Sequence, residues 1–174
     1  TSHKLLAVME GHTGWVSVLA VSNGKVFSGS LDEAIRVWDA TTHKLLAVIE
    51  GHTRDVWSLA VSNGKVFSGS WDKSIRVWDA TSHELLAVME GHTAWIKSLV
   101  VSNGKVFLGT IDKSIRVWVS TTHELLPVMD GHSREVVSVA VTYSKLSPRA
   151  PVQSHLGGAA TTPQLIAAMA CNTR

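Results

Sequence analysis

A segment of forty residues occurs three times in succession, and this repetition constrains the fold more than any other feature of the 174-residue sequence. Residues 1–40 and 41–80 are identical at 31 of 40 positions, a third copy spans 81–120, and a partial fourth copy spans 121–141. A repeat of this length usually encodes one supersecondary unit that stacks on its neighbours. The repetition therefore predicts one domain over residues 1–141, built from near-identical units.

Each copy predicts four short strands joined by tight turns. In the second copy the strand candidates are residues 44–50, 56–62, 65–70 and 74–79. The dipeptide Asn63-Gly64 separates two of them and is a strong hairpin signal, because both turn positions favour a positive φ. Several of these strands are continuously apolar, which favours a sheet covered on both faces. We therefore expect an all-β protein made of stacked four-stranded antiparallel sheets.

Three dipeptide and tripeptide motifs recur with the period of the repeat. Each full copy carries Gly-His, then SGS or LGT followed by a turn with aspartate, and the first two close on Trp-Asp. Together these motifs resemble the WD40 repeat family, over roughly residues 1–141. The resemblance implies a β-propeller in which the first strand of each sequence repeat completes the preceding blade. It thus implies one unpaired outer strand, three complete blades and one unpaired inner strand.

Propellers close with about four to eight blades. Three blades would leave two sheet faces uncovered, so we expect an incomplete ring that is either a segment of a longer propeller or is completed by identical chains. Residues 142–174 diverge from the repeat and contain prolines that interrupt strands. For them we expect a disordered tail with a short helix over residues 163–172, after Thr162-Pro163.

Composition narrows the function classes. Hydrophobic residues make up 45% of the chain, but no apolar segment reaches the roughly 20 residues that a membrane helix needs. The net charge is only +2, whereas a nucleic-acid-binding surface usually has a large basic excess. Cys171 is the single cysteine, which favours a reducing, cytoplasmic compartment. Neither membrane insertion nor nucleic-acid binding is therefore expected.

Each repeat also carries residue types found in catalytic triads, at fixed offsets. A Ser-His-Asp hydrolase needs one activated nucleophile beside an oxyanion site, not one copy in every repeat. The resemblance implies instead a structural hydrogen-bonded tetrad, in which the third repeat has Leu108 at the serine position and the third blade is the least rigid. The tetrad residues are His12, Ser28, Asp32 and Trp38, then His52, Ser68, Asp72 and Trp78, then His92, Asp112 and Trp118.

The nine histidines raise the alternative of a metal site. Four belong to the Gly-His pairs, and four more recur once per blade in the turns at residues 3, 43, 83 and 123. That spacing places them too far apart for one tetrahedral site, and no short His or Cys spacing suggests a ligand set. We expect no metal, no cofactor and no catalytic residue.

The copies differ mainly just after Gly-His, along the inner strand, and in the turn before the tetrad aspartate. The resemblance implies that these positions reach the face around the central channel where partners dock. Tryptophan is enriched there, as it is among binding hot spots. The residues that we expect to contact a partner are Trp15, Asp55, Trp57, Trp71, Lys73, Trp95, Lys97 and Ile111.

The leading hypothesis is a non-catalytic scaffold that docks a protein or peptide on this face. One alternative is a self-assembling structural segment of a larger regulatory protein. Another is a face that binds single-stranded RNA by tryptophan stacking, with Arg54, Lys73, Lys97 and Lys113 near the phosphates. The acidic residues Glu33, Asp55 and Glu135 at variable positions argue against the RNA hypothesis.

Overall fold

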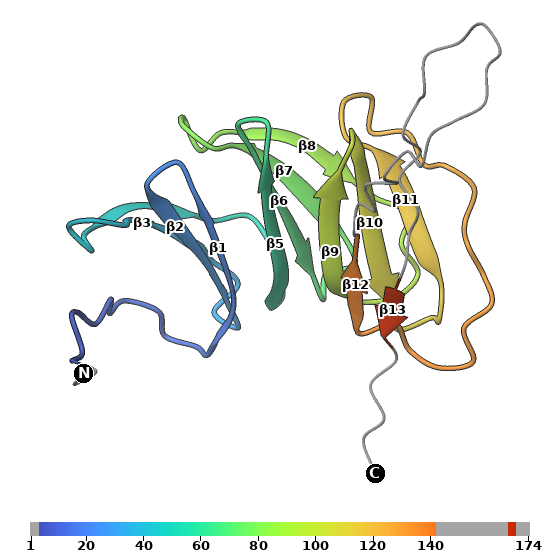
Figure 1. The fold of residues 1–174 in the computed structure, drawn as a ribbon, viewed down its shortest axis with the longest axis horizontal. Helices are drawn as coiled ribbons and strands as arrows, with labels where there is room; N and C mark the ends of the chain where they lie inside the picture. The colour runs from blue at the N-terminus through green and yellow to red at the C-terminus, as the bar shows by residue number, and fades with distance from the viewer. Residues whose placement is uncertain (1–3, 142–166, 170–174) are drawn as a thin grey trace, which may run out of the picture.

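A computed structural model describes residues 4–141 and 167–169 of the chain. Every regular element among them is a β-strand, and no helix there could cross a membrane. The strands form successive antiparallel sheets, here called blades, which stand side by side in chain order (Figure 1). The expectation of an all-β fold made of stacked antiparallel sheets is confirmed.

The first blade is a four-stranded meander. Its strands are β1 (Val16–Ser22), β2 (Lys25–Ser30), β3 (Ile35–Asp39) and β4 (Leu45–Ile49), in that order across the sheet. The turn between β1 and β2 is the predicted Asn-Gly hairpin, with φ of 48° at Asn23 and 70° at Gly24. Positive φ at both positions matches the right-handed twist of the strands, which is why this dipeptide closes the hairpin.

The second blade repeats the first forty residues later. It contains β5 (Val56–Ser62), β6 (Lys65–Ser70), β7 (Ile75–Asp79) and β8 (Leu85–Met89). Its strand order and pairing partners are those of the first blade shifted by forty. The near-identity of the two copies therefore extends from sequence to strand pairing.

The third blade differs at its outer edge. Strands β9 (Ile96–Ser102), β10 (Lys105–Thr110) and β11 (Ile115–Val119) form a three-stranded sheet. The fourth segment forms no regular strand beside β11 and pairs with it through the isolated bridges Ile115–Met129 and Trp118–Leu125. Leu126 N also donates to Val117 O at 2.8 Å. Pro127 stands where the other copies have alanine, and proline cannot donate an N–H to the ladder. The expected outer strand is therefore reduced to two bridges.

The two ends of the stack also depart from expectation. Residues 4–10 were expected to form an unpaired outer strand, but they form no strand because no neighbouring sheet offers them a partner. The partial fourth copy forms β12 (Ser138–Ala140), which pairs with β13 (Ala167–Met169). The helix expected over 163–172 is thus wrong at 167–169; the remainder of the expected tail lies outside the described residues.

Three apolar clusters lie between successive blades. The inner strands β1, β5, β9 and β12 follow one another side by side, and each cluster joins one blade to the next (Figure 1). Phe27 and Phe67 are 1% exposed, and Phe107 is 7% exposed, each at the same offset in its repeat. The core is thus a series of repeated interfaces, and the blades do not close into a ring.

Candidate functional site

A line of hydrogen bonds crosses the second blade. Trp78 Nε1 donates to Ser68 Oγ at 2.9 Å, and Ser68 Oγ lies 2.7 Å from His52 Nε2. His52 Nδ1 then lies 2.6 Å from Asp72 Oδ2. A carboxylate only accepts, so Nδ1 carries the proton and Nε2 accepts from the serine hydroxyl. Every polar atom in this line is satisfied, and Ser68 is completely buried.

The carboxylate at the end of the line holds the following turn. Asp72 also accepts from Thr53 N at 3.3 Å, Ser74 N at 2.9 Å and Ser74 Oγ at 2.7 Å. Burial raises the pKa of Asp72, but the hydrogen bonds that it accepts from His52 and Ser74 outweigh burial and hold the pKa well below its ordinary value of 3.8. Asp72 is therefore ionised and fixed across the physiological pH range.

The first blade contains the same line. His12 Nδ1 lies 2.9 Å from Asp32 Oδ2, His12 Nε2 lies 2.7 Å from Ser28 Oγ, and Trp38 Nε1 donates to Ser28 Oγ at 2.8 Å. Arg36 adds an ion pair to Asp32 at 2.8 Å. Both repeats that contain all four residue types therefore form the hydrogen-bonded tetrad.

The third blade lacks the bridging hydroxyl. Leu108 is fully buried where Ser28 and Ser68 stand in the other blades. Both ring nitrogens of His92 and the Nε1 atom of Trp118 are buried without a hydrogen-bond partner. Burial and the charge of Arg116 lower the pKa of His92 to about 4. The lower rigidity expected of this blade remains a prediction.

A second repeated contact joins the variable positions of each copy. The residue before the tetrad aspartate donates its backbone N–H to the carbonyl of the residue sixteen positions earlier, which directly precedes the inner strand. Leu31 N lies 3.0 Å from Trp15 O, Trp71 N lies 3.0 Å from Asp55 O, and Ile111 N lies 3.4 Å from Trp95 O. The tetrad aspartate holds this turn in place. The turn residue just before the aspartate is therefore held beside the start of the inner strand.

Three tryptophans from two blades stack on this surface. The ring centroids of Trp57 and Trp71 are 5.1 Å apart, and those of Trp71 and Trp95 are 4.5 Å apart. The interplanar angles are 17° and 18°, so the rings are nearly parallel. Lys97 Nζ lies 4.4 Å from the Trp57 centroid and 5.1 Å from the Trp71 centroid, a distance typical of cation–π contacts. We call Trp57, Trp71, Trp95 and Lys97 the aromatic cluster.

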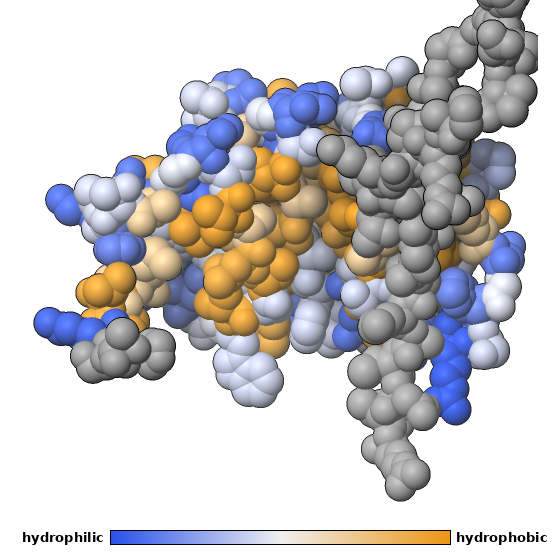
Figure 2. All heavy atoms as spheres, in the orientation of Figure 1, coloured by the Kyte–Doolittle hydropathy of each residue, from blue (hydrophilic) through white to orange (hydrophobic). Residues whose placement is uncertain are grey.

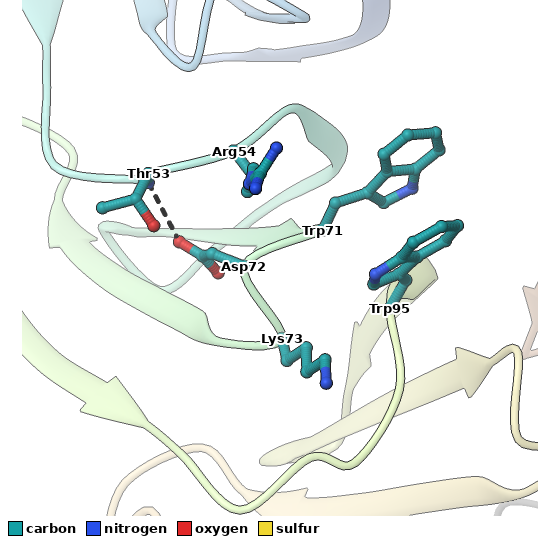
Figure 3. Close-up of a pocket in the computed structure, with 6 residues that line it drawn as sticks. All are labelled: Thr53, Arg54, Trp71, Asp72, Lys73 and Trp95. Carbon is teal, nitrogen blue, oxygen red and sulfur yellow. Dashed lines mark hydrogen bonds between the residues drawn. The ribbon is translucent and has the colours of Figure 1, made fainter.

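A pocket of about 420 Å³ opens beside the aromatic cluster (Figure 3). The rings of Trp71 and Trp95 lie face to face on one side, and the side chains of Arg54 and Lys73 project from the neighbouring turns. A second pocket of about 230 Å³ lies alongside and shares Lys73 and Trp95. The residues that line the two pockets are Thr53, Arg54, Trp71, Asp72, Lys73, Thr93, Ala94, Trp95 and Ile111.

The structure places six of the eight residues expected at the site together and two apart from them. Trp57, Trp71, Trp95 and Lys97 form the cluster, and Lys73 and Ile111 line the adjoining pockets. Asp55 is half-buried and contributes its carbonyl oxygen to the turn. Trp15 is 82% exposed and joins no stack among the described residues.

Two pocket residues that directly follow Gly-His-Thr were not among the residues expected to contact a protein partner. Arg54 lines the first pocket and Ala94 the second. Arg54 was expected to contact a partner only in the RNA hypothesis, and Ala94 in none. Both occupy a position that varies among the copies, directly after Gly-His-Thr. That variability placed both positions on the expected docking face, but the expected protein-contact residues included neither of them.

The site offers no arrangement for metal binding in the part of the chain that the structure describes. No three His, Cys, Asp or Glu side chains converge there as ligands. His43, His83 and His123 sit in the turns of three different blades, each with a positive φ near 60°.

Comparison with known proteins gives one family and many similar structures. The family model "WD domain, G-beta repeat" matches residues 3–39, 43–79 and 83–119, which is more than half of the chain. Comparison with curated proteins gave no match.

Two of the similar structures differ in how much of their own length this chain covers. The computationally designed Ika4 protein is 34% identical with a TM-score of 0.74, over 83% of this chain and 94% of that one. The WD40 beta propeller domain of Doa1 is 27% identical with a TM-score of 0.67, over 75% of this chain and 44% of that one. The chain thus spans almost all of one solved relative and less than half of the other.

Proposed function

We propose that this chain, which belongs to the WD40 repeat family, is a non-catalytic module that binds a protein or peptide at the aromatic cluster and its two pockets. Propellers of this family generally mediate protein–protein interaction. The observation that supports this location is the convergence of Trp57, Trp71 and Trp95, from positions that vary while the scaffold of the repeat does not.

The composition of the cluster matches that of binding hot spots. Tryptophan and arginine carry a large share of the free energy in protein interfaces, especially at the centre of a well-packed patch. Trp95 is 43% exposed, although it stacks on Trp71, so much of its apolar surface is available to a partner. The Nε1 atoms of Trp57 and Trp71 are buried without a hydrogen-bond partner, so ring stacking and the cation–π contacts of Lys97 hold those rings.

The charges around the first pocket favour an acidic segment. Arg54 and Lys73 are both exposed at its rim and form no ion pair that the structure records in the described residues. The one acidic residue that lines it, Asp72, is already engaged by His52 and Thr53. A carboxylate of a partner would meet two free cations, while an apolar side chain would meet Trp95 and Ile111.

The tetrads support a structural role rather than catalysis. Ser68 Oγ is buried and accepts from Trp78, so a substrate carbonyl has no access to it. The same line of hydrogen bonds recurs in the first blade. A scaffold element is expected in every blade, whereas an active site is expected once.

The stack also disfavours the RNA hypothesis. Base stacking needs an aromatic ring with an open face. Trp71 lies between Trp57 and Trp95, and Lys97 lies over Trp57. Most ring faces of the cluster are therefore already occupied by one another.

A random peptide display library, selected on the purified chain, tests the proposal. We expect enriched peptides that combine acidic and large apolar residues. Trp71→Ala should weaken the binding of a selected peptide by about 2 kcal/mol, or roughly 30-fold in Kd, because the central ring supports both of its neighbours. Titration by fluorescence anisotropy measures this change.

The exposed Trp15, outside the cluster, provides the matched control. Trp15→Ala should leave the Kd of the same peptide unchanged. Equal losses in the two variants, or none in Trp71→Ala, would move the binding site elsewhere. Tighter binding of polyuridylate than of any selected peptide, with a steep dependence on salt, would replace the proposal by the RNA hypothesis.

A further inference from the structure

Two pockets of the same composition lie at successive junctions between blades, at the end of the strands opposite the aromatic cluster. They adjoin the Asn-Gly hairpin turns, which lie together at one end of the blades (Figure 1), and Figure 2 shows hydrophilic residues along that edge of the molecule. We call them the hairpin pockets. The first, of about 280 Å³, is lined by Ser22, Asn23, Lys25, Phe27, Val61, Gly64, Ala80 and Thr81. The second, of about 120 Å³, is lined by Ser62, Asn63, Lys65, Phe67, Val101, Ser120 and Thr121.

The repeat builds both pockets. Every residue that lines the second pocket stands forty positions after a residue that lines the first, and only Ala80 changes type, to Ser120. In each pocket the hairpin and the second strand of one blade face the inner strand and the third-strand turn of the next blade. A cavity that recurs at equivalent positions is a product of how the blades pack.

A half-buried lysine lines each pocket. Lys25 Nζ donates to Ala80 O of the next blade at 2.9 Å, which leaves two of its three N–H groups for another acceptor. Lys65 Nζ donates to no atom of the described residues. The ion pairs within residues 4–141 include neither lysine. Both ammonium groups therefore lack a counterion in the described structure.

The aspartate opposite Lys25 in the sheet does not neutralise it. Asp39 is the cross-strand partner of Lys25 between β2 and β3. Its carboxylate instead accepts from Thr41 N at 3.0 Å and from Thr42 N at 2.6 Å. These bonds hold the carboxylate on its own turn, so the charge of Lys25 stays available to a ligand.

The surroundings of the lysines favour an anion. A half-buried charge without a counterion has an electrostatic cost, which a bound anion reduces. Phe27 and Phe67 are 1% exposed and form apolar walls, next to which the attraction between charges is stronger than in water. Thr81 in the first pocket and Thr121 in the second supply a hydroxyl group that can donate to the same anion.

The volumes limit the size of the ligand. Sites for whole small molecules usually have about 300–1,000 Å³. The hairpin pockets, of about 280 and 120 Å³, are smaller than this, and the second has room for only about four water molecules at roughly 30 Å³ each. Both therefore suit a single charged group.

We propose that each hairpin pocket binds one small oxyanion, a carboxylate or phosphate group, on its lysine. In the first pocket the anion accepts from Lys25 of one blade and Thr81 of the next, and in the second from Lys65 and Thr121. The bound group thus bridges two neighbouring blades. This site goes beyond the proposed function, because it is separate from the aromatic cluster and can be occupied independently of it.

Two histidines beside these lysines provide a readout. Burial and the charge of Lys25 lower the pKa of His83, while the charge of Asp79 raises it. Burial and the charge of Lys65 likewise lower the pKa of His123. An anion that neutralises each ammonium charge should therefore raise the pKa of both histidines.

NMR of the histidine ring signals in the full chain tests the inference. The probes are sodium phosphate and sodium acetate, with sodium chloride at equal ionic strength as the reference. We expect the signals of His83 and His123 to shift and saturate, and their pKa values to rise. His43 is the internal control, because no blade precedes it in the described structure, and its signal should not change. The probe that saturates at the lower concentration shows whether the pockets prefer phosphate or carboxylate.

Two matched variants connect the response to the lysines. Lys25→Met should weaken binding at His83 by roughly tenfold or more and leave binding at His123 unchanged, and Lys65→Met should do the reverse. Lys25→Arg should keep the response, because it keeps the charge. Equal shifts of all three histidines, no saturable shift, or unchanged binding at His123 in Lys65→Met would overturn the inference. The Lys65→Met result decides the question even if the loss of the bond to Ala80 unfolds Lys25→Met, because Lys65 makes no such bond.

Discussion

The tetrad of the second blade allows a sharp test of how the scaffold is stabilised. Ser68→Ala removes one oxygen atom that serves two buried neighbours, His52 Nε2 at 2.7 Å and Trp78 Nε1 at 2.9 Å. His52 is 6% exposed and Trp78 is 3% exposed, so water cannot easily replace the hydroxyl. The substitution therefore leaves two polar groups unpaired at little change in volume.

The expected loss follows from the cost of an unpaired buried group. Each such group costs about 1–3 kcal/mol. Because the two groups share one partner and can relax together, we expect the free energy of unfolding to fall by about 2–4 kcal/mol. This loss is several times that of a substitution at an ordinary surface position, which is usually within about 0.5 kcal/mol.

Equilibrium unfolding in urea, followed by tryptophan fluorescence and by circular dichroism, measures the change. Coincident transitions are required for a two-state analysis. Ser28→Ala should cost a similar amount, because the first blade has the same hydrogen bonds. The control Ser62→Ala, half-exposed at the end of β5, should have little effect. A loss below about 0.5 kcal/mol for Ser68→Ala, equal to that of the control, would refute the reasoning.

Two further outcomes follow from the third blade and the blade interfaces. Burial lowers the pKa of His92 from 6.5 to about 4, so His92 stays neutral in the folded chain between these pH values. The unfolded chain binds a proton at His92 in that range. The free energy of unfolding should therefore fall by roughly 3 kcal/mol as the pH drops from about 6.5 to about 4. His92→Gln should remove this part of the pH dependence in urea unfolding; an unchanged pH profile would contradict the assignment. Gly69→Ala places a methyl group 2.5 Å from Ile96 Cγ2 and from Ser58 Oγ, between the second and third blades, and overpacking of this kind costs about 1–3 kcal/mol. We expect the Tm of this variant to fall by several degrees. An unchanged Tm would mean that the interface between the blades accommodates the added methyl group, and it would contradict the prediction.

Local sequence signals were sufficient for the blades. The Asn-Gly turns formed with positive φ, the strands lie where the apolar segments predicted them, and the family motifs identified the tetrad residues. The hairpin turns and the tetrads depend on contacts within one copy, so the sequence of a single repeat carries the information needed for them. Pro127 was a local signal as well, and it was missed although it predicts the interrupted strand of the third blade.

The composition of the candidate site depended on contacts between copies. Trp15 and Trp95 occupy the same position in their repeats, yet Trp95 joins the stack and Trp15 does not. Trp95 has the preceding blade's Trp71 beside it, whereas Trp15 has no preceding blade in the described structure. Which side chains meet across a blade interface is decided by the packing of whole sheets. The sequence alone therefore determined the blade and its tetrad, and only the tertiary structure decided which tryptophans form a surface, because that choice depends on the neighbour and not on the repeat.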